Sequence, residues 1–201
     1  MITKASYNFT YGLFVVTAKD AKDNGCITNT VGQVTTSPNR VTFAVNKANL
    51  THDMIARTGE ANVSIISQEA DFELFRRFGF QSGRSADKFD GFADVKRSAN
   101  GLYYITAGTN SWLSASVNGA IDLGTHTLFI AEVTEEGILS QVPSMSYDYY
   151  QSHVKPQREK PKKTVWRCRI CGYEYEGEEL PADFVCPLCK HGAEDFEKIE
   201  A

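Results

Sequence analysis

Short apolar segments recur through the first 140 residues. Residues 9–19 are rich in aromatic and β-branched side chains, and Val41, Phe43 and Val45 alternate toward one face of segment 40–46. Both patterns are typical of β-strands. The same criteria predict further strands at 26–36, 61–67, 102–106, 112–118 and 125–133, and favour one more at 137–142.

Two short helices interrupt this pattern. Asn49 or Thr51 is suited to cap a helix that ends near residue 57, and a second helix is predicted at 71–78. The triplets at 23–25 and 37–39 are turn signals. Because short strands alternate with turns, the sequence predicts a mainly β fold, a closed or partly closed antiparallel barrel.

The chain changes character after residue 150. Residues 151–163 contain two prolines, no aromatic residue and a formal charge of +4, whereas residues 164–201 carry −5. We therefore expect a domain at 1–150, a linker at 151–163 and a small domain at 164–201. The alternative for 151–163 is an extra edge strand.

The composition is that of a soluble globular protein, with 42% hydrophobic and 23% charged residues in 201. The N-terminus has no signal-peptide pattern, and no apolar run reaches membrane-spanning length, so we expect a cytoplasmic protein without membrane contact. The net charge is −4. The acidic tail argues against nucleic acid as a partner.

The small domain contains two Cys-x-x-Cys motifs, which we call the first and the second hook. They comprise Cys168 with Cys171, and Cys186 with Cys189. Four thiolates at this spacing can surround one metal ion. Structural disulfides are disfavoured, because nothing indicates secretion. The spacing alone fits a zinc ribbon nearly as well as a mononuclear iron site.

Residues around the hooks favour iron. Gly172 follows the first hook, where a left-handed backbone would turn N–H groups toward the sulfurs. Five aromatic residues provide an apolar shell: Trp166, Tyr173, Tyr175, Phe184 and Phe196. The string Cys-x-x-Cys-Gly-Tyr-x-Tyr with Cys-Pro-Leu-Cys resembles rubredoxin over residues 164–198. Lys190 departs from that pattern, which has Gly at this position. A residue other than glycine would destabilise the hook by roughly 1–2 kcal/mol if the position is left-handed.

A polar segment lies where a core strand is expected. Its hydroxyl and amide groups are suited to hydrogen-bond a planar polar ring or a phosphate; they belong to Thr28, Asn29, Thr30 and Gln33. Lys47 adds a cation beside a predicted helix N-terminus, which suits an anion. The alternative is a solvated barrel face. No Rossmann motif or phosphate loop is present.

Four motifs in the first 150 residues resemble the flavin reductase-like, FMN-binding split-barrel family. They are NGCITNTVGQVT, VNKANLTH, FGFQSGR with Asp87-Lys88-Phe89, and GTHTLF. The resemblance implies FMN near a homodimer interface, with Thr28, Asn29, Thr30 and Gln33 along the flavin. It implies Lys47, Asn49 and Thr51 around the phosphate, helped by Arg84 or Lys88, and Asn46 among the other cofactor contacts. His126 would lie near the flavin or nicotinamide, although Thr125 replaces the family's Asp.

The domain order resembles the high-molecular-weight rubredoxins. It implies an enzyme that passes electrons from NAD(P)H through FMN to a four-cysteine iron, and on to a protein acceptor such as a flavodiiron oxygen or nitric oxide reductase. One alternative is a flavin reductase that releases reduced flavin and has a structural zinc tail. Another is a non-enzymatic module with a zinc ribbon that serves assembly.

Overall fold

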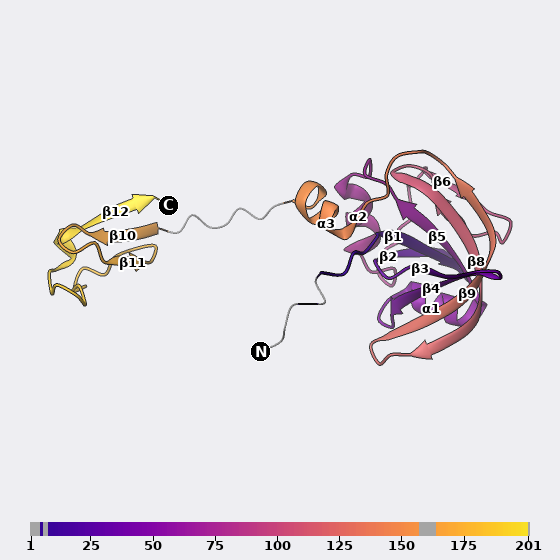
Figure 1. Cartoon of the computed structure of the whole chain (residues 1–201), viewed down its shortest axis with the longest axis horizontal. Coiled ribbons are helices and arrows are strands. Elements are labelled where there is room, and N and C mark those ends of the chain that lie inside the picture. The colour runs from indigo at the N-terminus through magenta and orange to yellow at the C-terminus, as the bar shows by residue number, and fades with distance from the viewer. Residues whose placement is uncertain (1–4, 6–7, 157–163, 201) are drawn as a thin grey trace. The chain divides into compact units, whose positions relative to one another are not determined.

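The computed structural model describes residues 5, 8–156 and 164–200 of the chain (Figure 1). It divides into two compact units, Met1–Lys155 and Pro156–Ala201. Residues 157–163 of the predicted linker lie outside the described residues, and residues 151–154 are helical. No helix in the described part of the chain is long and apolar enough to cross a membrane.

The larger unit is built on one seven-stranded antiparallel sheet. Its order is β2-β1-β5-β8-β9-β4-β3. The strands are β1 (Phe14–Lys19), β2 (Asp23–Thr28), β3 (Gly32–Thr36), β4 (Asn39–Asn46), β5 (Glu60–Ile66), β8 (Thr109–Asp122) and β9 (His126–Ile138). A separate hairpin pairs β6 (Val95–Arg97) with β7 (Tyr103–Ile105). This confirms the predicted mainly β fold with few short helices.

The sheet curls so that its two edges, β2 and β3, are consecutive in the chain. Side chains, not a backbone ladder, join β2 to β4 near this seam. Thr28 Oγ1 donates to the Ala44 carbonyl at 3.0 Å, and Thr30 Oγ1 lies 3.2 Å from the same oxygen. Thr30 Oγ1 also accepts from Ala44 N at 3.1 Å. The barrel is therefore split at this point, and two threonines bridge the split.

The interior of the curled sheet is apolar. Phe43 of β4 and Phe129 of β9 are almost fully buried, with ring centroids 5.6 Å apart. Helix α1 (Leu50–Thr58) contributes Met54 and Ile55 to this core. Gly59 ends the helix in the left-handed conformation, with φ 72°. Burying these side chains is the main source of the unit's stability.

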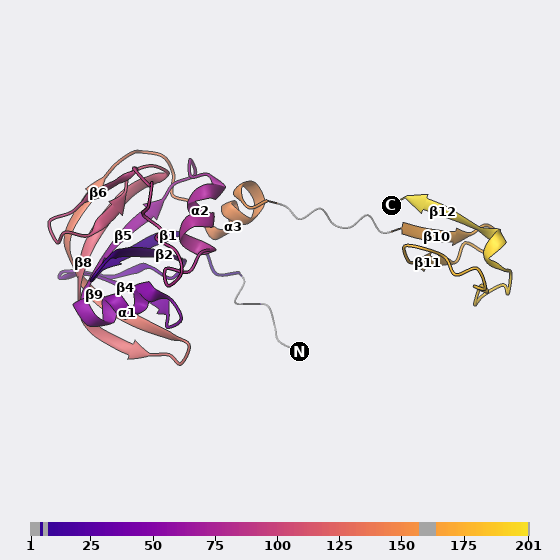
Figure 2. The ribbon, with the colours of Figure 1, turned by 180° about the vertical axis from the view of Figure 1, so that it is seen from behind.

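A second core lies between α2 (Phe72–Gly79) and the end of the unit, where α3 (Tyr147–Tyr149) leads into a π-helical turn (Tyr150–Val154). The Phe75 and Tyr150 rings are 4.3 Å apart. Asp71 caps α2 by accepting from Leu74 N. Both α2 and α3 appear together on one side of the unit in Figure 2.

Several predicted boundaries are wrong. The 23–25 segment is not a turn but part of β2, because Asn24 is buried and donates to Thr51 Oγ1, and because the Phe78 ring packs against Gly25. The predicted strand 26–36 breaks at 29–31, where the chain crosses from one sheet edge to the other. Strand β6 was not predicted, and the strand predicted at 137–142 is absent, since β9 ends at Ile138 and residues 139–142 form no strand.

The smaller unit has a three-stranded sheet in the order β11-β10-β12. Its elements are β10 (Thr164–Cys168), β11 (Glu174–Glu176), a 3₁₀ turn (Ala193–Asp195) and β12 (Phe196–Glu200). The five predicted aromatic residues pack against Cys168 and Cys186, which confirms the apolar shell. Phe184 lies at its centre, with its ring 4.7 Å from that of Tyr175 and 5.3 Å from that of Phe196.

Candidate metal centre and flavin site

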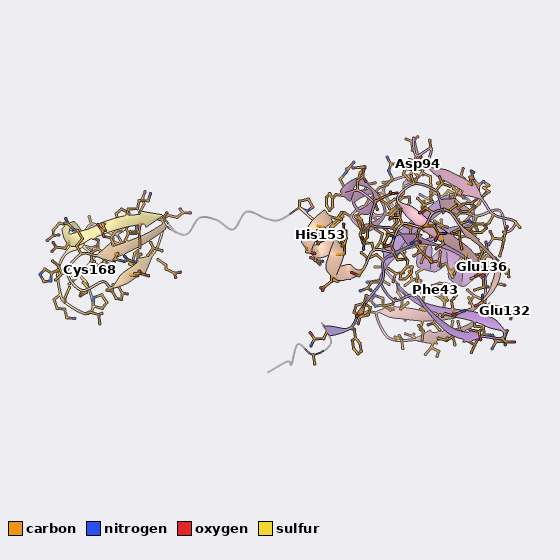
Figure 3. All side chains as sticks on the ribbon, turned by 45° about the horizontal axis from the view of Figure 1, so that its top comes forward. Phe43, Asp94, Glu132, Glu136, His153 and Cys168 are labelled. Atoms are coloured by element: carbon orange, nitrogen blue, oxygen red, sulfur yellow. The ribbon has the colours of Figure 1, made fainter. Side chains whose placement is uncertain are left out.

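The four hook cysteines converge in the smaller unit, where Figure 3 labels Cys168. Their four Sγ atoms all lie within 4.8 Å of one another. Cys168 and Cys189 sulfurs are 3.6 Å apart, and Cys171 and Cys186 sulfurs are 3.5 Å apart. A metal–sulfur bond of about 2.3 Å implies sulfurs about 3.8 Å apart in a tetrahedron. The four thiols therefore fit one tetrahedral ion.

Each hook turns in the same way. The N–H of Gly172 donates to the Cys168 carbonyl at 2.8 Å, and the N–H of Lys190 donates to the Cys186 carbonyl at 3.0 Å. Gly172 has φ 76° and Lys190 has φ 65°, so both positions are left-handed as expected. The turns direct backbone N–H groups at sulfur: Tyr173 donates to Cys171, and His191 donates to Cys189.

The thiols perturb one another strongly. Burial raises the pKa of Cys186. Hydrogen bonds from the backbone N–H groups of Cys189 and Leu188 and from the neighbouring thiols outweigh burial and lower this pKa to about 6. The N–H of His191 lowers the pKa of Cys189, while burial and the other three thiols raise it by more, to about 12. Four thiolates therefore need a cation among them, which is the role of a metal ion.

Three predicted phosphate ligands surround the start of α1. Asn49 is the N-cap residue but makes no side-chain capping bond, and its carbonyl accepts from His52 N at 3.1 Å. The N–H groups of Leu50 and Thr51 therefore remain available to an anion. Lys47 is half-exposed, and its Nζ lies 2.6 Å from Asp122 Oδ1. Thr51 is fully buried, and its hydroxyl accepts from Asn24. A phosphate can therefore reach Lys47 and the helix start, while Thr51 supports the helix from beneath.

A hydrogen-bonded chain joins three segments beside this point. Arg84 Nη2 donates to Asp53 Oδ2 at 2.7 Å, and Asp53 Oδ1 lies 3.0 Å from His52 Nδ1. His52 Nε2 lies 2.8 Å from Thr127 Oγ1 on β9. Hydrogen bonds from His52, and then from Arg84, lower the pKa of Asp53. From the sequence we expect a role for Arg84 here but none for His52 or Asp53, because the contacts that tie them to Thr127 and Arg84 span 75 and 31 residues.

Lys88 lies deep in the protein. Its side chain is only 3% exposed, and its Nζ donates to the carbonyls of Gly25 and Phe78 at 2.8 and 3.1 Å. Burial lowers the pKa of Lys88. The residue thus fastens the loop after α2, residues 80–94, to β2, and both contacts of its ammonium are with backbone carbonyls.

The other candidates lie on two neighbouring strands and at the seam. Asn46 pairs with His126 across β4 and β9, and its side chain accepts from Ala48 N. His126 is partly exposed, with Nδ1 2.9 Å from Thr125 Oγ1. Asn29 is partly exposed in the crossing between β2 and β3, and Gln33 Nε2 donates to Asn39 Oδ1. The hydroxyls of Thr28 and Thr30 are the ones that bridge the split.

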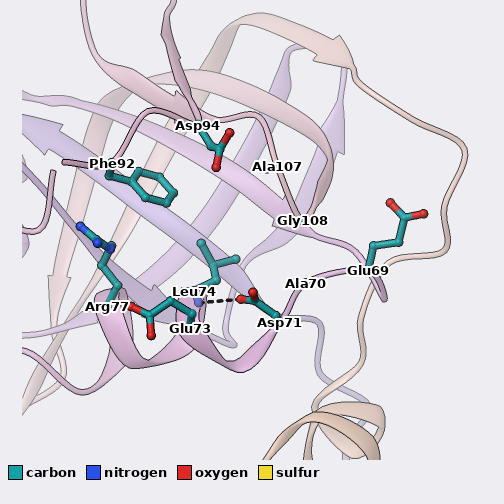
Figure 4. A pocket seen from close by; sticks show the side chains of 10 residues that line it. All are labelled: Glu69, Ala70, Asp71, Glu73, Leu74, Arg77, Phe92, Asp94, Ala107 and Gly108. Atoms are coloured by element: carbon teal, nitrogen blue, oxygen red, sulfur yellow. Dashed lines mark hydrogen bonds between the residues drawn. The ribbon is translucent and has the colours of Figure 1, made fainter.

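A separate cavity of about 350 Å³ lies at the start of α2 and includes none of these candidates (Figure 4). Four carboxylates line it, from Glu69, Asp71, Glu73 and Asp94, against one cation, Arg77. Such a lining repels a phosphate, so this cavity is unsuited to FMN.

Comparison with known families decides the identity of the larger unit. The family model described as flavin reductase like domain matches residues 6–157. The chain belongs to this family. A second model, the rubredoxin-like domain of rubrerythrin, matches residues 166–197, which include all four hook cysteines.

One relative covers nearly the whole chain, and two others cover about three quarters of it. The high molecular weight rubredoxin of Moorella thermoacetica is 36% identical over 99% of this chain and 100% of its own length. The ferric-chelate reductase (NAD(P)H) of Archaeoglobus fulgidus is 34% identical over 75% of this chain and 89% of its own. The NADH:FAD oxidoreductase SgcE6 of Streptomyces globisporus has a similar fold, with TM-score 0.62, 25% identity, and coverage of 76% and 88%. These findings support an oxidoreductase with a flavin domain and a rubredoxin-like iron domain.

Proposed function

We propose that the protein passes electrons from NAD(P)H through FMN to a mononuclear iron and on to a protein acceptor. The observation that supports this most is the convergence of four thiols in a chain that also contains a flavin reductase domain. Bound flavin supplies the conversion between two-electron hydride transfer and single-electron transfer.

The phosphate of FMN is proposed to lie at the start of α1. Lys47 would exchange its contact with Asp122 for the phosphate, and the N–H groups after Asn49 would donate to it. Arg84 lies at the same end, where its Nε donates to the Ala48 carbonyl at 3.4 Å, and Asp53 orients its guanidinium. Lys88 and Thr51 would act indirectly, by holding the loop and the helix in place.

The ring and ribityl chain are proposed to lie along the seam. Asn29 and Gln33 present amides there, and Thr28 and Thr30 fix the crossing that carries Asn29. His126 would border the flavin face on which nicotinamide stacks. His126 is the first residue of β9 and pairs with Asn46, the residue before Lys47. This places His126 close to the proposed phosphate.

The assembly and acceptor belong to the same proposal. All of β3 is exposed, and Val34 on this edge strand is 54% exposed, which supports a homodimer in which a second copy covers the strand. The acceptor would be a flavodiiron oxygen or nitric oxide reductase, and the reaction would take place in the cytoplasm.

One experiment tests the proposal. Purified protein is analysed for iron, zinc and flavin, and its absorption spectrum is followed during anaerobic addition of NADH or NADPH. We expect one iron and one FMN per chain, with bleaching of the flavin band before the iron band. Zinc with dissociable flavin would instead indicate a flavin reductase with a structural tail. Zinc without flavin would indicate an assembly module.

A second candidate function is ferric-chelate reduction, since a relative of that name is 34% identical over 75% of this chain. A truncated protein that ends at Lys155 distinguishes the two. Ferric-chelate reduction should survive the truncation, because it would need only the flavin domain. Reduction of a protein acceptor through iron should be lost.

A further inference from the structure

The two hooks form an internal comparison within the metal centre. They share one turn, with matching hydrogen bonds and matching left-handed residues, but the first hook has Gly172 and the second has Lys190. Lys190 is the one residue other than glycine with a positive φ in the described part of the chain. The left-handed backbone conformation is thus adopted in one hook by glycine, which favours it, and in the other by lysine, for which it is strained.

Packing does not explain the lysine. Lys190 is exposed, and its ammonium makes no hydrogen bond or ion pair with the residues that the structure describes. The arginines nearby differ. Arg167 pairs with Glu174 at 2.8 Å, and Arg169 donates to the Glu194 carbonyl at 2.8 Å. Lys190 therefore keeps an uncompensated positive charge one residue from the Cys189 thiolate.

That charge lies where an electron arrives. A ferric ion with four thiolates has a net charge of −1. Reduction by one electron, with no proton taken up, changes the net charge of the centre to −2. The small unit is already acidic, with −5 over residues 164–201. Both facts oppose reduction, and a nearby cation favours the more negative state. We infer that Lys190 is a positioned charge that raises the reduction potential of the iron centre and so favours electron transfer from the flavin.

The test uses variants that separate charge from backbone strain. Lys190→Gln removes the charge but keeps an L side chain at the left-handed position. Lys190→Gly removes both the charge and the strain, and Lys190→Arg keeps both. The iron midpoint potential is measured on the full chain by optical redox titration at one pH, and the unfolding temperature is measured on the same samples.

We expect a lower midpoint potential for both Lys190→Gln and Lys190→Gly, and an unchanged one for Lys190→Arg. Only Lys190→Gly should also unfold at a higher temperature. Because the charge is exposed, the difference between wild type and Lys190→Gln should shrink as ionic strength rises. The converse variant Gly172→Lys should raise the potential while lowering the unfolding temperature, and Gly172→Ala should lower only the unfolding temperature.

This inference rests on the iron in the proposed function, so iron content is determined first for every variant. A colourless zinc protein would overturn both proposals. A red iron protein whose potential is the same in wild type and Lys190→Gln would overturn this inference alone. A potential that falls in Lys190→Gly but not in Lys190→Gln would assign the effect to backbone strain.

Discussion

The metal centre and the flavin site are built in opposite ways. All four metal ligands come from a short stretch, 168–189, and their sulfurs already have nearly tetrahedral spacing. The flavin candidates come from the seam, α1, the loop after α2 and β9. Most of their polar groups already have partners inside the protein, such as Asp122 for Lys47 and Ala44 for Thr30. A metal site built from one short segment can have its final geometry before the ion binds. A site assembled from distant segments needs hydrogen bonds within the protein to hold its side chains in place.

The largest effect should come from breaking the chelate. Changing Cys168 to Ser should abolish stable iron binding, because the buried centre loses one of four thiolates. FMN should stay bound, because the thiols belong to a separate compact unit. Iron analysis and the flavin spectrum on one sample measure both. Cys26→Ala is the matched control, since Cys26 is a buried cysteine of the other unit and should keep the iron.

A truncation sharpens the same contrast. Ending the chain at Lys155 keeps the π-helical turn, whose Tyr150 packs in the second core, and should leave the affinity for FMN unchanged. Truncated protein that folds but does not bind FMN would show that the tail contributes to the flavin site.

The next effect concerns the distant site. Lys47→Ala should weaken FMN binding by about ten- to a hundredfold, because a charge-assisted contact contributes roughly 1.5–3 kcal/mol. Riboflavin, which has no phosphate, should bind as before. Fluorescence titration with the two ligands makes the comparison, and Lys96→Ala, at an exposed lysine on β6, is the control. Equal weakening of both ligands would remove Lys47 from the phosphate site.

A smaller effect is expected from an internal partner. Asp53→Asn weakens the contacts to His52 and Arg84 and should loosen the loop beside α1. The groups are partly exposed, so we expect about 1 kcal/mol, or roughly fivefold in FMN affinity. Asp94→Asn, in the acidic cavity, should change nothing. If the two variants bind FMN equally well, the hydrogen-bonded chain has no part in the site.

The smallest expected effect is on how the free energy of unfolding changes at acidic pH. Hydrogen bonds lower the pKa of Asp53 and Asp122 below 3.8, chiefly from His52 and Lys47 respectively. Their contribution to stability is therefore present above pH 3.8 and is lost as the pH falls through the lower folded values. Unfolding free energy measured against pH should decline less steeply in Asp53→Asn than in wild type. An identical decline would show that Asp53 adds nothing to folding.

The same contrast governs what the sequence could predict. Hook spacing, the left-handed turns and the aromatic shell are local, and the structure confirms their geometry. The burial of Lys88 and the hydrogen bond between His52 and Thr127 are not local. They depend on which strands become neighbours. The turn predicted at 23–25 is likewise replaced by a strand, because Asn24 and Gly25 pack against distant residues.

The contact between Lys47 and Asp122 makes two parts of the flavin site interdependent. Asp122 also accepts from Gly124 N at 2.7 Å, in the turn that leads to His126, and Lys47 N donates to the Thr125 carbonyl. In the proposed flavin site, a phosphate that binds Lys47 would leave Asp122 in contact with the turn alone. Phosphate binding would thereby be coupled to the strand end that carries His126. By linkage, a ligand that binds against His126 would change the affinity for the phosphate by the same factor as the phosphate changes the affinity for that ligand.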